Sequence, residues 1–120
     1  MTLREKQSAF ARLVSRLIIE ATRRGYEITL GEAWRSPQEA QRQGFPNSLH
    51  TKRLAIDINL FRDGVYLTTA ADHKPLGLWW EAQSTPELKC AWGGRFGESA
   101  PGKGDGRDAN HYSIRHGGVR

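Results

Sequence analysis

The sequence predicts an α+β fold in which an N-terminal helix and shorter helices pack on a central, mainly antiparallel sheet. Apolar residues near the N-terminus recur at helical spacing, whereas residues 54–61 alternate between apolar side chains and small or polar ones. The Asp63-Gly64 pair that follows is a hairpin signal, which favours antiparallel neighbours. With 120 residues the chain is expected to form a small single domain, residues 1–120.

The first elements are predicted by their caps and their periodicity. Thr2 and Glu5 form a capping-box pattern ahead of the apolar stripe, and Gly25 is a natural stop. A helix is therefore expected over residues 3–24. The alternating, strand-forming residues 26–30 follow it.

A second capping-box pattern, Ser36 to Glu39 with Pro37 at the first helical position, predicts a short helix that ends near Gly44. The Asp-Gly turn predicts that residues 54–61 pair with a short return strand. Proline favours the first turn of a helix, so the next helix is expected to start at Pro75. The remaining expected elements are a return strand at 65–67, a helix at 75–83, strands at 89–92 and 111–114, a long loop at 93–106 and a C-terminal tail.

Two distant segments contain the residue types of a hydrolytic metal site. His50 and Asp57 lie in the first, and Asp108 and His111 lie in the second. Asp57 stands in the middle of an apolar strand, where an unpaired carboxylate is costly to bury. Two imidazoles, a carboxylate to join them on a metal and a spare carboxylate to act as a base make up the inventory of such a site. Purely structural roles remain alternatives: Asp57 could be paired with an Arg or with backbone amides, and Asp108 and His111 could be a turn residue and a strand residue.

Other polar residues are weaker candidates. Arg35 could hold a substrate carboxylate or a developing oxyanion, and Trp34 beside it is the aromatic residue best placed to line a cleft. Ser48 could donate a hydrogen bond to substrate or to a metal ligand. His73, expected at a helix start on the surface, and His116, expected in a mobile tail, are less suited to be ligands.

Composition restricts the kinds of metal site, the partner and the location that are expected. Cys90 is the single cysteine, so a disulfide within the chain and a cysteine-rich zinc site are both excluded, and a buried position in a strand is expected for it. The net charge of +5 suggests an anionic partner such as nucleic acid, a membrane surface or a bacterial envelope. The N-terminus lacks the apolar segment of a secretory signal, and no stretch is apolar enough to span a membrane, so synthesis in the cytoplasm and no stable membrane insertion are expected.

The pattern Ser-x-His-x-x-x-x-Ala-x-Asp, followed at a distance by Asp-x-x-His, resembles a family of zinc peptidases. The family comprises D-alanyl-D-alanine carboxypeptidases, vancomycin-resistance dipeptidases and phage endolysins that cut L-alanyl-D-glutamate bonds in peptidoglycan. A Trp-Arg-Ser-Pro segment at 34–37 and a Trp-Gly-Gly segment at 92–94 also resemble family segments. The resemblance covers about residues 31–113. Many members have Gly where this chain has Arg53, a difference expected to alter loop packing or to narrow the cleft.

The resemblance implies that His50, Asp57 and His111 bind Zn²⁺. It implies that Asp108 is the catalytic acid/base, a place other branches fill with Glu, and that Arg35 positions substrate or stabilises the transition state. Asp108 and the absence of a signal peptide favour the endolysin branch. The expected protein is a monomeric, bacteriolytic hydrolase of phage or prophage origin, without a separate wall-binding module, that reaches peptidoglycan in the periplasm after a holin opens the inner membrane.

Two rivals stay open on the sequence alone. A D-alanyl-D-alanine carboxypeptidase or dipeptidase would use the same zinc site on another bond of the stem peptide. A basic nucleic-acid-binding protein with structural His and Asp residues would need no metal, and it ranks last because the chain has no recognised nucleic-acid motif. No nucleic-acid partner is therefore expected.

Overall fold

The structure, a computed structural model, describes residues 1–96 and 108–120. Within them the strands form a sheet of order β1-β2-β5-β4, and β3 pairs with β2. Every pairing is antiparallel, so the predicted fold class is confirmed. The strands are β1 (Glu27–Leu30), β2 (Ala55–Arg62), β3 (Val65–Leu67), β4 (Cys90–Trp92) and β5 (His111–Ile114). The helices are α1 (Leu3–Arg23), α2 (Pro37–Arg42) and α3 (Ala70–Ala82), and two 3-10 turns are η1 (Leu49–Lys52) and η2 (Gly93–Arg95).

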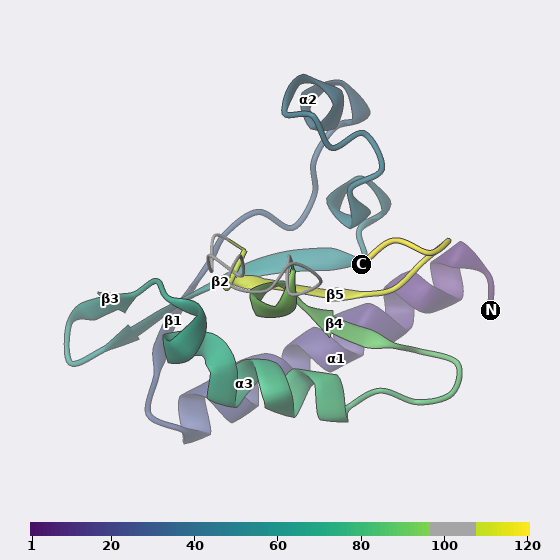
Figure 1. The fold of residues 1–120 in the computed structure, drawn as a ribbon. Coiled ribbons are helices and arrows are strands. Elements are labelled where there is room, and N and C mark those ends of the chain that lie inside the picture. Colours follow the sequence, from purple (N-terminus) through teal and green to yellow (C-terminus); the bar gives the residue numbers. More distant parts are fainter. Residues whose placement is uncertain (97–107) are drawn as a thin grey trace.

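The sheet separates a core side from a side that carries polar residues. Figure 1 shows α1 and α3 on one side of the sheet and α2 on the other. Successive side chains of a strand point to opposite faces. The buried Ile56 and Ile58 of β2 therefore face the core, and Asp57 and Asn59, both partly exposed, face the side on which α2 lies.

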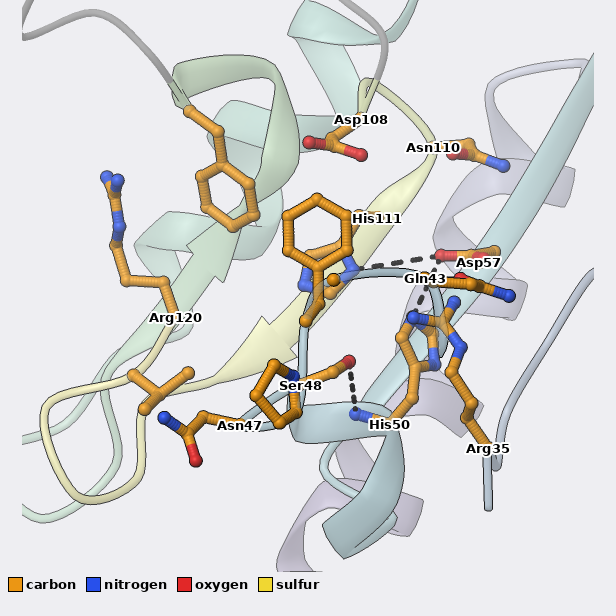
Figure 2. A pocket seen from close by; sticks show the side chains of 15 residues that line it. Arg35, Gln43, Asn47, Ser48, His50, Asp57, Asp108, Asn110, His111 and Arg120 are labelled. Atoms are coloured by element: carbon orange, nitrogen blue, oxygen red, sulfur yellow. Dashed lines mark hydrogen bonds and ion pairs between the residues drawn. The ribbon is translucent and has the colours of Figure 1, made fainter. Parts of the chain in front are cut away.

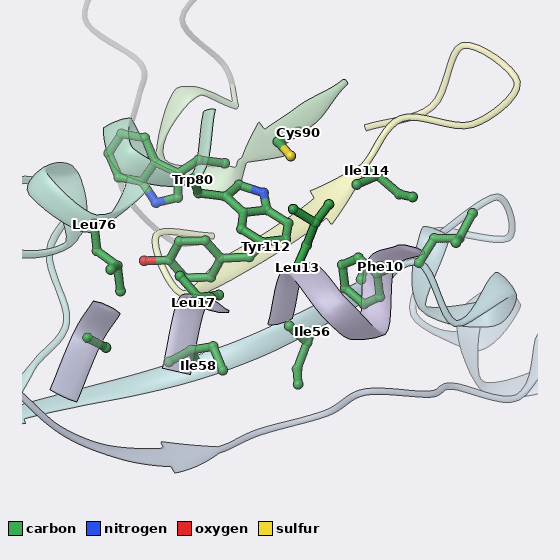
Figure 3. Packing of buried hydrophobic residues seen from close by; sticks show 14 of the residues in the cluster. Phe10, Leu13, Leu17, Ile56, Ile58, Leu76, Trp80, Cys90, Tyr112 and Ile114 are labelled. Atoms are coloured by element: carbon green, nitrogen blue, oxygen red, sulfur yellow. The ribbon is translucent and has the colours of Figure 1, made fainter. Parts of the chain in front are cut away.

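The core forms where α1 and α3 meet the apolar face of the sheet (Figure 3). Trp80 of α3 is at its centre, with edge-to-face contacts to Phe10 and to Tyr112 at centroid distances of 6.0 and 6.1 Å. Its indole Nε1 donates to the carbonyl oxygens of Ala91 and Ser113, so one side chain joins the helix to β4 and β5. Trp80 and Trp92 are buried, and Trp79 packs against the same cluster.

Local signals predicted most element ends closely. The Thr2–Glu5 capping box of α1 is formed in full. At α2 the Ser36 hydroxyl accepts from the Glu39 backbone N–H, but the Glu39 carboxylate binds Arg42 and Gln43 instead of closing a box. The hairpin between β2 and β3 turns at Asp63 and Gly64, whose φ values of 52° and 78° are those of a type I′ turn.

The prediction for α3 is wrong at its N-terminus. The helix starts five residues earlier than Pro75, at Ala70, behind a capping box formed by Thr69 and Asp72. Pro75 lies in the second turn, where its missing N–H costs one helical hydrogen bond. Burial of the neighbouring Leu76 and Trp80 offsets that cost.

The longer helix also moves His73 from the surface into the core. This side chain is 1% exposed, and its Nδ1 lies 2.9 Å from the Tyr112 hydroxyl. Burial lowers the pKa of His73, opposed by a hydrogen bond to the backbone of Leu67. A neutral imidazole can accept a hydrogen bond from the Tyr112 hydroxyl at Nδ1 and donate one through its other nitrogen. The predicted surface position is therefore wrong.

The C-terminal half otherwise follows expectation. Cys90 is buried in β4, where burial raises the pKa of its thiol to about 11. The start of the loop expected over 93–106 is the turn η2, and residues 97–107 lie outside the described residues. The expected mobile tail is instead a turn closed by His116 and Val119. In the described residues none of the helices combines the length and apolar character needed to cross a bilayer.

Replacing His73 by Asn should make the protein's stability less sensitive to acid. The imidazole has a pKa of about 6.5 in the unfolded chain, and burial lowers this pKa in the folded protein. Below about pH 6.5 the unfolded chain therefore binds the proton more readily, and the free energy of unfolding falls as the pH drops. Between about pH 7.5 and about pH 5.5, the variant should lose about 1 kcal/mol less free energy of unfolding than the parent. Urea titrations at both pH values measure this. His116→Asn, outside the core, is the control, and equal losses in the parent and His73→Asn would refute the assignment.

Candidate metal centre

Strand register brings the first two candidate ligands together. In the antiparallel ladder between β2 and β5, Asp57 lies directly opposite His111, one step beyond the buried Ile56–Tyr112 pair. Side chains of directly opposed residues share a face of the sheet. The Asp57 carboxylate and the His111 imidazole therefore lie side by side, with Asp57 Oδ1 3.7 Å from His111 Nδ1.

The third candidate ligand, His50, comes from η1. Ser48 caps this turn by accepting the His50 backbone N–H at 3.3 Å, which begins the turn just ahead of β2. His50 is 3% exposed, and its Nε2 lies 3.3 Å from Asp57 Oδ1. Its ring meets that of His111 edge to face, with centroids 5.2 Å apart. One atom each from His50, Asp57 and His111 thus falls within 4.8 Å of the others.

This arrangement fits a small divalent cation. Zinc–ligand distances of about 2.0–2.1 Å in a tetrahedral site imply ligand atoms about 3.3 Å apart, and the two contacts of Asp57 Oδ1 are 3.3 and 3.7 Å. Burial raises the pKa of Asp57, but hydrogen bonds from His111 and His50 lower it more, and the resulting value is about 2. The carboxylate is therefore ionised at neutral pH, as a metal ligand must be.

Contacts with Asp57 and packing orient the two imidazole rings. Each ring has a second nitrogen that is turned away from Asp57, Nδ1 in His50 and Nε2 in His111. Both atoms are buried and have no hydrogen-bond partner in the described part of the chain. Phe96 packs on the His111 ring with centroids 5.2 Å apart. Within residues 1–96 and 108–120, Asp57 is the polar group that contacts both rings, and a cation beside its carboxylate would be reached by both.

The backbone ahead of α2 binds Asp57 on its other side. The Asp57 N–H donates to the Glu32 carbonyl at 3.0 Å, and the Gly31 N–H donates to the Asp57 carbonyl at 2.8 Å. A Cβ at Gly31 would stand 2.9 Å from the Asp57 Cβ, closer than real side chains approach. Glycine is therefore required for the segment 31–32 to run this close to the candidate ligand.

The Trp-Gly-Gly segment supports the strand of His111 in the same way. The Trp92 indole donates to the Ala109 carbonyl at 2.7 Å and packs against Gly77 and Gly94. A Cβ on Gly93 would stand 2.0 Å from the Asp108 carbonyl oxygen and 2.7 Å from the His111 Cβ. The glycines thus allow η2 to lie directly against the turn that carries Asp108 and His111.

Arg35 lies next to the candidate ligands but is already engaged. Its Nε and Nη2 donate to the two carboxylate oxygens of Glu32 at 2.8 and 2.9 Å. The hydrogen bond from Arg35 lowers the pKa of Glu32. This side-on pairing occupies one edge of the guanidinium and leaves the Nη1 end, together with one Nη2 proton, to donate elsewhere.

A cleft of about 700 Å³ opens over the three candidate ligands. Figure 2 shows His50, Asp57 and His111 at its base, with Asp108 beside His111 and Arg35 beside His50. Ser48 also lines the cleft, with its oxygen turned to the His50 backbone. The predicted residues that line the cleft are therefore Arg35, Ser48, His50, Asp57, Asp108 and His111.

Trp34 is placed differently from the other candidates. It is 47% exposed and does not belong to the cleft lining, and the Arg53 guanidinium lies over its ring at 5.2 Å. Arg53 has φ 57° and ψ 37°, the left-handed conformation that glycine adopts most readily. Arg53 thus packs against Trp34 and does not line the cleft.

Several residues at or beside the cleft are not predicted from the sequence. Glu32 was not singled out, although an acid three residues before Arg35 is a cue for an ion pair. Phe96 and Arg120 line the cleft itself, which Glu32 does not, and the sequence predicts Arg120 only as part of a C-terminal tail. Two glycines near the C-terminus, Gly117 and Gly118, were the available signal that the chain turns back there.

Gly31→Ala should weaken metal binding more than it weakens the fold. The added methyl group would push on the Cβ and the carbonyl oxygen of Asp57, at 2.9 and 3.2 Å, and so displace one ligand. Zinc affinity, measured by competition with a chromophoric chelator, should fall roughly tenfold or more, as when a ligand's supporting contact is lost. Ala33→Gly, an exposed change two residues away, is the control. Unchanged affinity in a folded Gly31→Ala protein would contradict this account.

Comparison with known proteins gives a likeness of fold. No protein-family model matches the chain, and no curated protein matches it. Among solved structures, the Serratia marcescens L-Ala D-Glu endopeptidase ChiX is similar, with a TM-score of 0.60 and 20% sequence identity. The match covers 88% of this chain and 79% of that one. At this identity the likeness establishes that the two chains share a fold.

Proposed function

We propose that this chain is a zinc-dependent peptidase that hydrolyses the stem peptides of peptidoglycan, and that the bond it cuts joins L-alanine to D-glutamate. The observation that carries the proposal is the convergence of His50, Asp57 and His111 at the base of an open cleft. Its support is the shared fold with an L-Ala D-Glu endopeptidase. The motifs at 48–57 and 108–111 add the same family resemblance.

The residues divide the chemistry between them. His50, Asp57 and His111 would hold the zinc ion, which supplies Lewis-acid activation of the peptide carbonyl and of a water molecule. Asp108 takes the proton of the attacking water and delivers it to the amine nitrogen as the carbon–nitrogen bond breaks. With the second water proton also passed to the amine, the products are a carboxylate and a protonated amine, and Asp108 returns to its starting state.

Arg35 has a role that its pairing with Glu32 makes specific. The Glu32 carboxylate holds the guanidinium by its Nε edge, so its direction is set before substrate binds. The remaining N–H groups donate to the carbonyl oxygen of the scissile bond as that oxygen gains negative charge. Preorganised donors of this kind act without reorganising during the reaction.

The decisive experiment combines metal analysis with product analysis. Purified protein should contain about one zinc per chain, lose hydrolysis of isolated peptidoglycan on chelation and regain it when zinc is added back. Mass spectrometry of the digested muropeptides should show stem peptides released with an N-terminal glutamate. Loss of only the terminal D-alanine would instead establish the carboxypeptidase rival, and metal-independent activity would refute the zinc assignment.

Asp108→Asn should retain zinc and the fold but lose at least about a hundredfold in hydrolysis, because the amide cannot accept the proton. His50→Ala is the contrasting variant, since it removes a ligand and should lose zinc together with activity. Zinc content by mass spectrometry and release of muropeptides separate the two effects. Full activity in Asp108→Asn would exclude this residue as the base.

We further propose that the chain acts as a phage or prophage endolysin, made in the cytoplasm and active on the wall once the inner membrane is opened. Its net charge of +5 favours approach to the anionic envelope. Expression in a Gram-negative host should therefore lyse cells only when a membrane permeabiliser is supplied. Lysis without the permeabiliser would contradict the dependence on prior membrane opening.

A further inference from the structure

A second guanidinium stands at the cleft, on the segment that follows β5. Arg120 lines the cleft together with Phe96, and its guanidinium carbon lies 4.7 Å from the centre of the Phe96 ring. This is a cation–π contact. Figure 2 shows Arg120 and Arg35 on opposite sides of the two imidazoles. The cleft therefore has a cation at each side of the candidate metal centre.

A turn anchored at several points brings Arg120 to this position. Gly117 and Gly118 both have positive φ, and His116 and Val119 exchange backbone hydrogen bonds of 3.0 and 2.9 Å across the turn. Lys6 of α1 lies 3.1 Å from His116 through Nζ and Nδ1. The turn is thus tied to α1, and it directs the chain back over the cleft.

The two cations differ in their charge balance. Arg35 is paired with Glu32, so much of its charge is compensated within the protein. Arg120 forms no ion pair with an Asp or Glu side chain in residues 1–96 and 108–120, and its guanidinium lies over the Phe96 ring. Phe96 also contacts His111, so the Arg120 guanidinium stands one aromatic ring away from a candidate metal ligand.

We propose that Arg120 is a substrate-binding residue that holds a free carboxylate of the peptide, on the side of the cleft away from Arg35. The inference rests on the proposed function. A glutamate within a peptide uses one carboxyl group to continue the chain and leaves its other one free. In an alanyl-glutamate substrate that free carboxylate lies within a few bonds of the scissile amide, and a guanidinium matches it with two parallel N–H donors. Arg120 thereby selects acidic substrates over their amides.

The test compares two synthetic stem peptides, one with the free glutamyl carboxylate and one with that group converted to the amide. Zinc-loaded parent protein should have the lower KM for the acid. Arg120→Gln should raise KM for the acid about tenfold, leave kcat and zinc content in place and remove the preference between the peptides. Arg120→Lys, which keeps the charge but not the fork, should restore part of the preference. Arg12→Gln, the same change at an exposed position on α1, is the matched control.

Binding gives a readout that does not depend on turnover. Titration calorimetry on zinc-loaded Asp108→Asn should show tighter binding of the acid than of the amide, and a second change, Arg120→Gln, should abolish the difference. The subsite is overturned if the parent does not discriminate, if Arg120→Gln weakens both peptides equally or if Arg12→Gln has the same effect. If discrimination in binding depends on Arg120 but neither peptide is cut by the parent, the subsite stands and the proposed function fails.

Discussion

The pairing of β2 with β5 is the constraint on which the candidate site depends. Ile56 lies opposite Tyr112 in the core, and in the next step of the same ladder Asp57 lies opposite His111 on the other face. A slip of one residue in either strand would turn every side chain to the wrong face. Burial of the apolar pair therefore also holds the two polar side chains together, and the energy that stabilises the core sets the geometry of the candidate metal centre.

Close approach of backbone segments completes that geometry. Gly31 and Gly93 lie against Asp57 and against the Asp108–His111 turn, where no Cβ would fit. The two glycines act on opposite sides of the Asp57–His111 pair, one ahead of α2 and one in η2. Backbone thus flanks the Asp57–His111 pair on both sides, and it is stiffer than side chains.

Three charged groups at the cleft, Asp57, Arg35 and Arg120, each have a different partner. Asp57 is stabilised as an anion by two imidazoles, and Glu32 directs Arg35 while compensating its charge. The Arg120 guanidinium lies over the Phe96 ring and has no Asp or Glu side chain paired with it in the described residues. In the proposed reaction Asp57 helps to hold the metal, and Arg35 binds the oxygen on which negative charge develops. Arg120 binds the carboxylate that the substrate already carries. A different charged group would then serve each of metal binding, catalysis and substrate selectivity.

The sequence by itself determined the features that depend on near neighbours. Alternation in β2, the capping box of α1 and the turn at Asp63 are local, and each formed as predicted. The prediction that α3 begins at Pro75 was wrong because the local capping box of Thr69 and Asp72 starts the helix earlier, and burial of Leu76 and Trp80 offsets the cost of the proline. The earlier start also places His73 in the core. Motif order suggested which residues belong to the site. Only the tertiary structure decided which nitrogens meet Asp57, that Glu32 pairs with Arg35 and that Arg120 returns to the cleft, because strand register and turn geometry bring together groups that lie far apart along the chain.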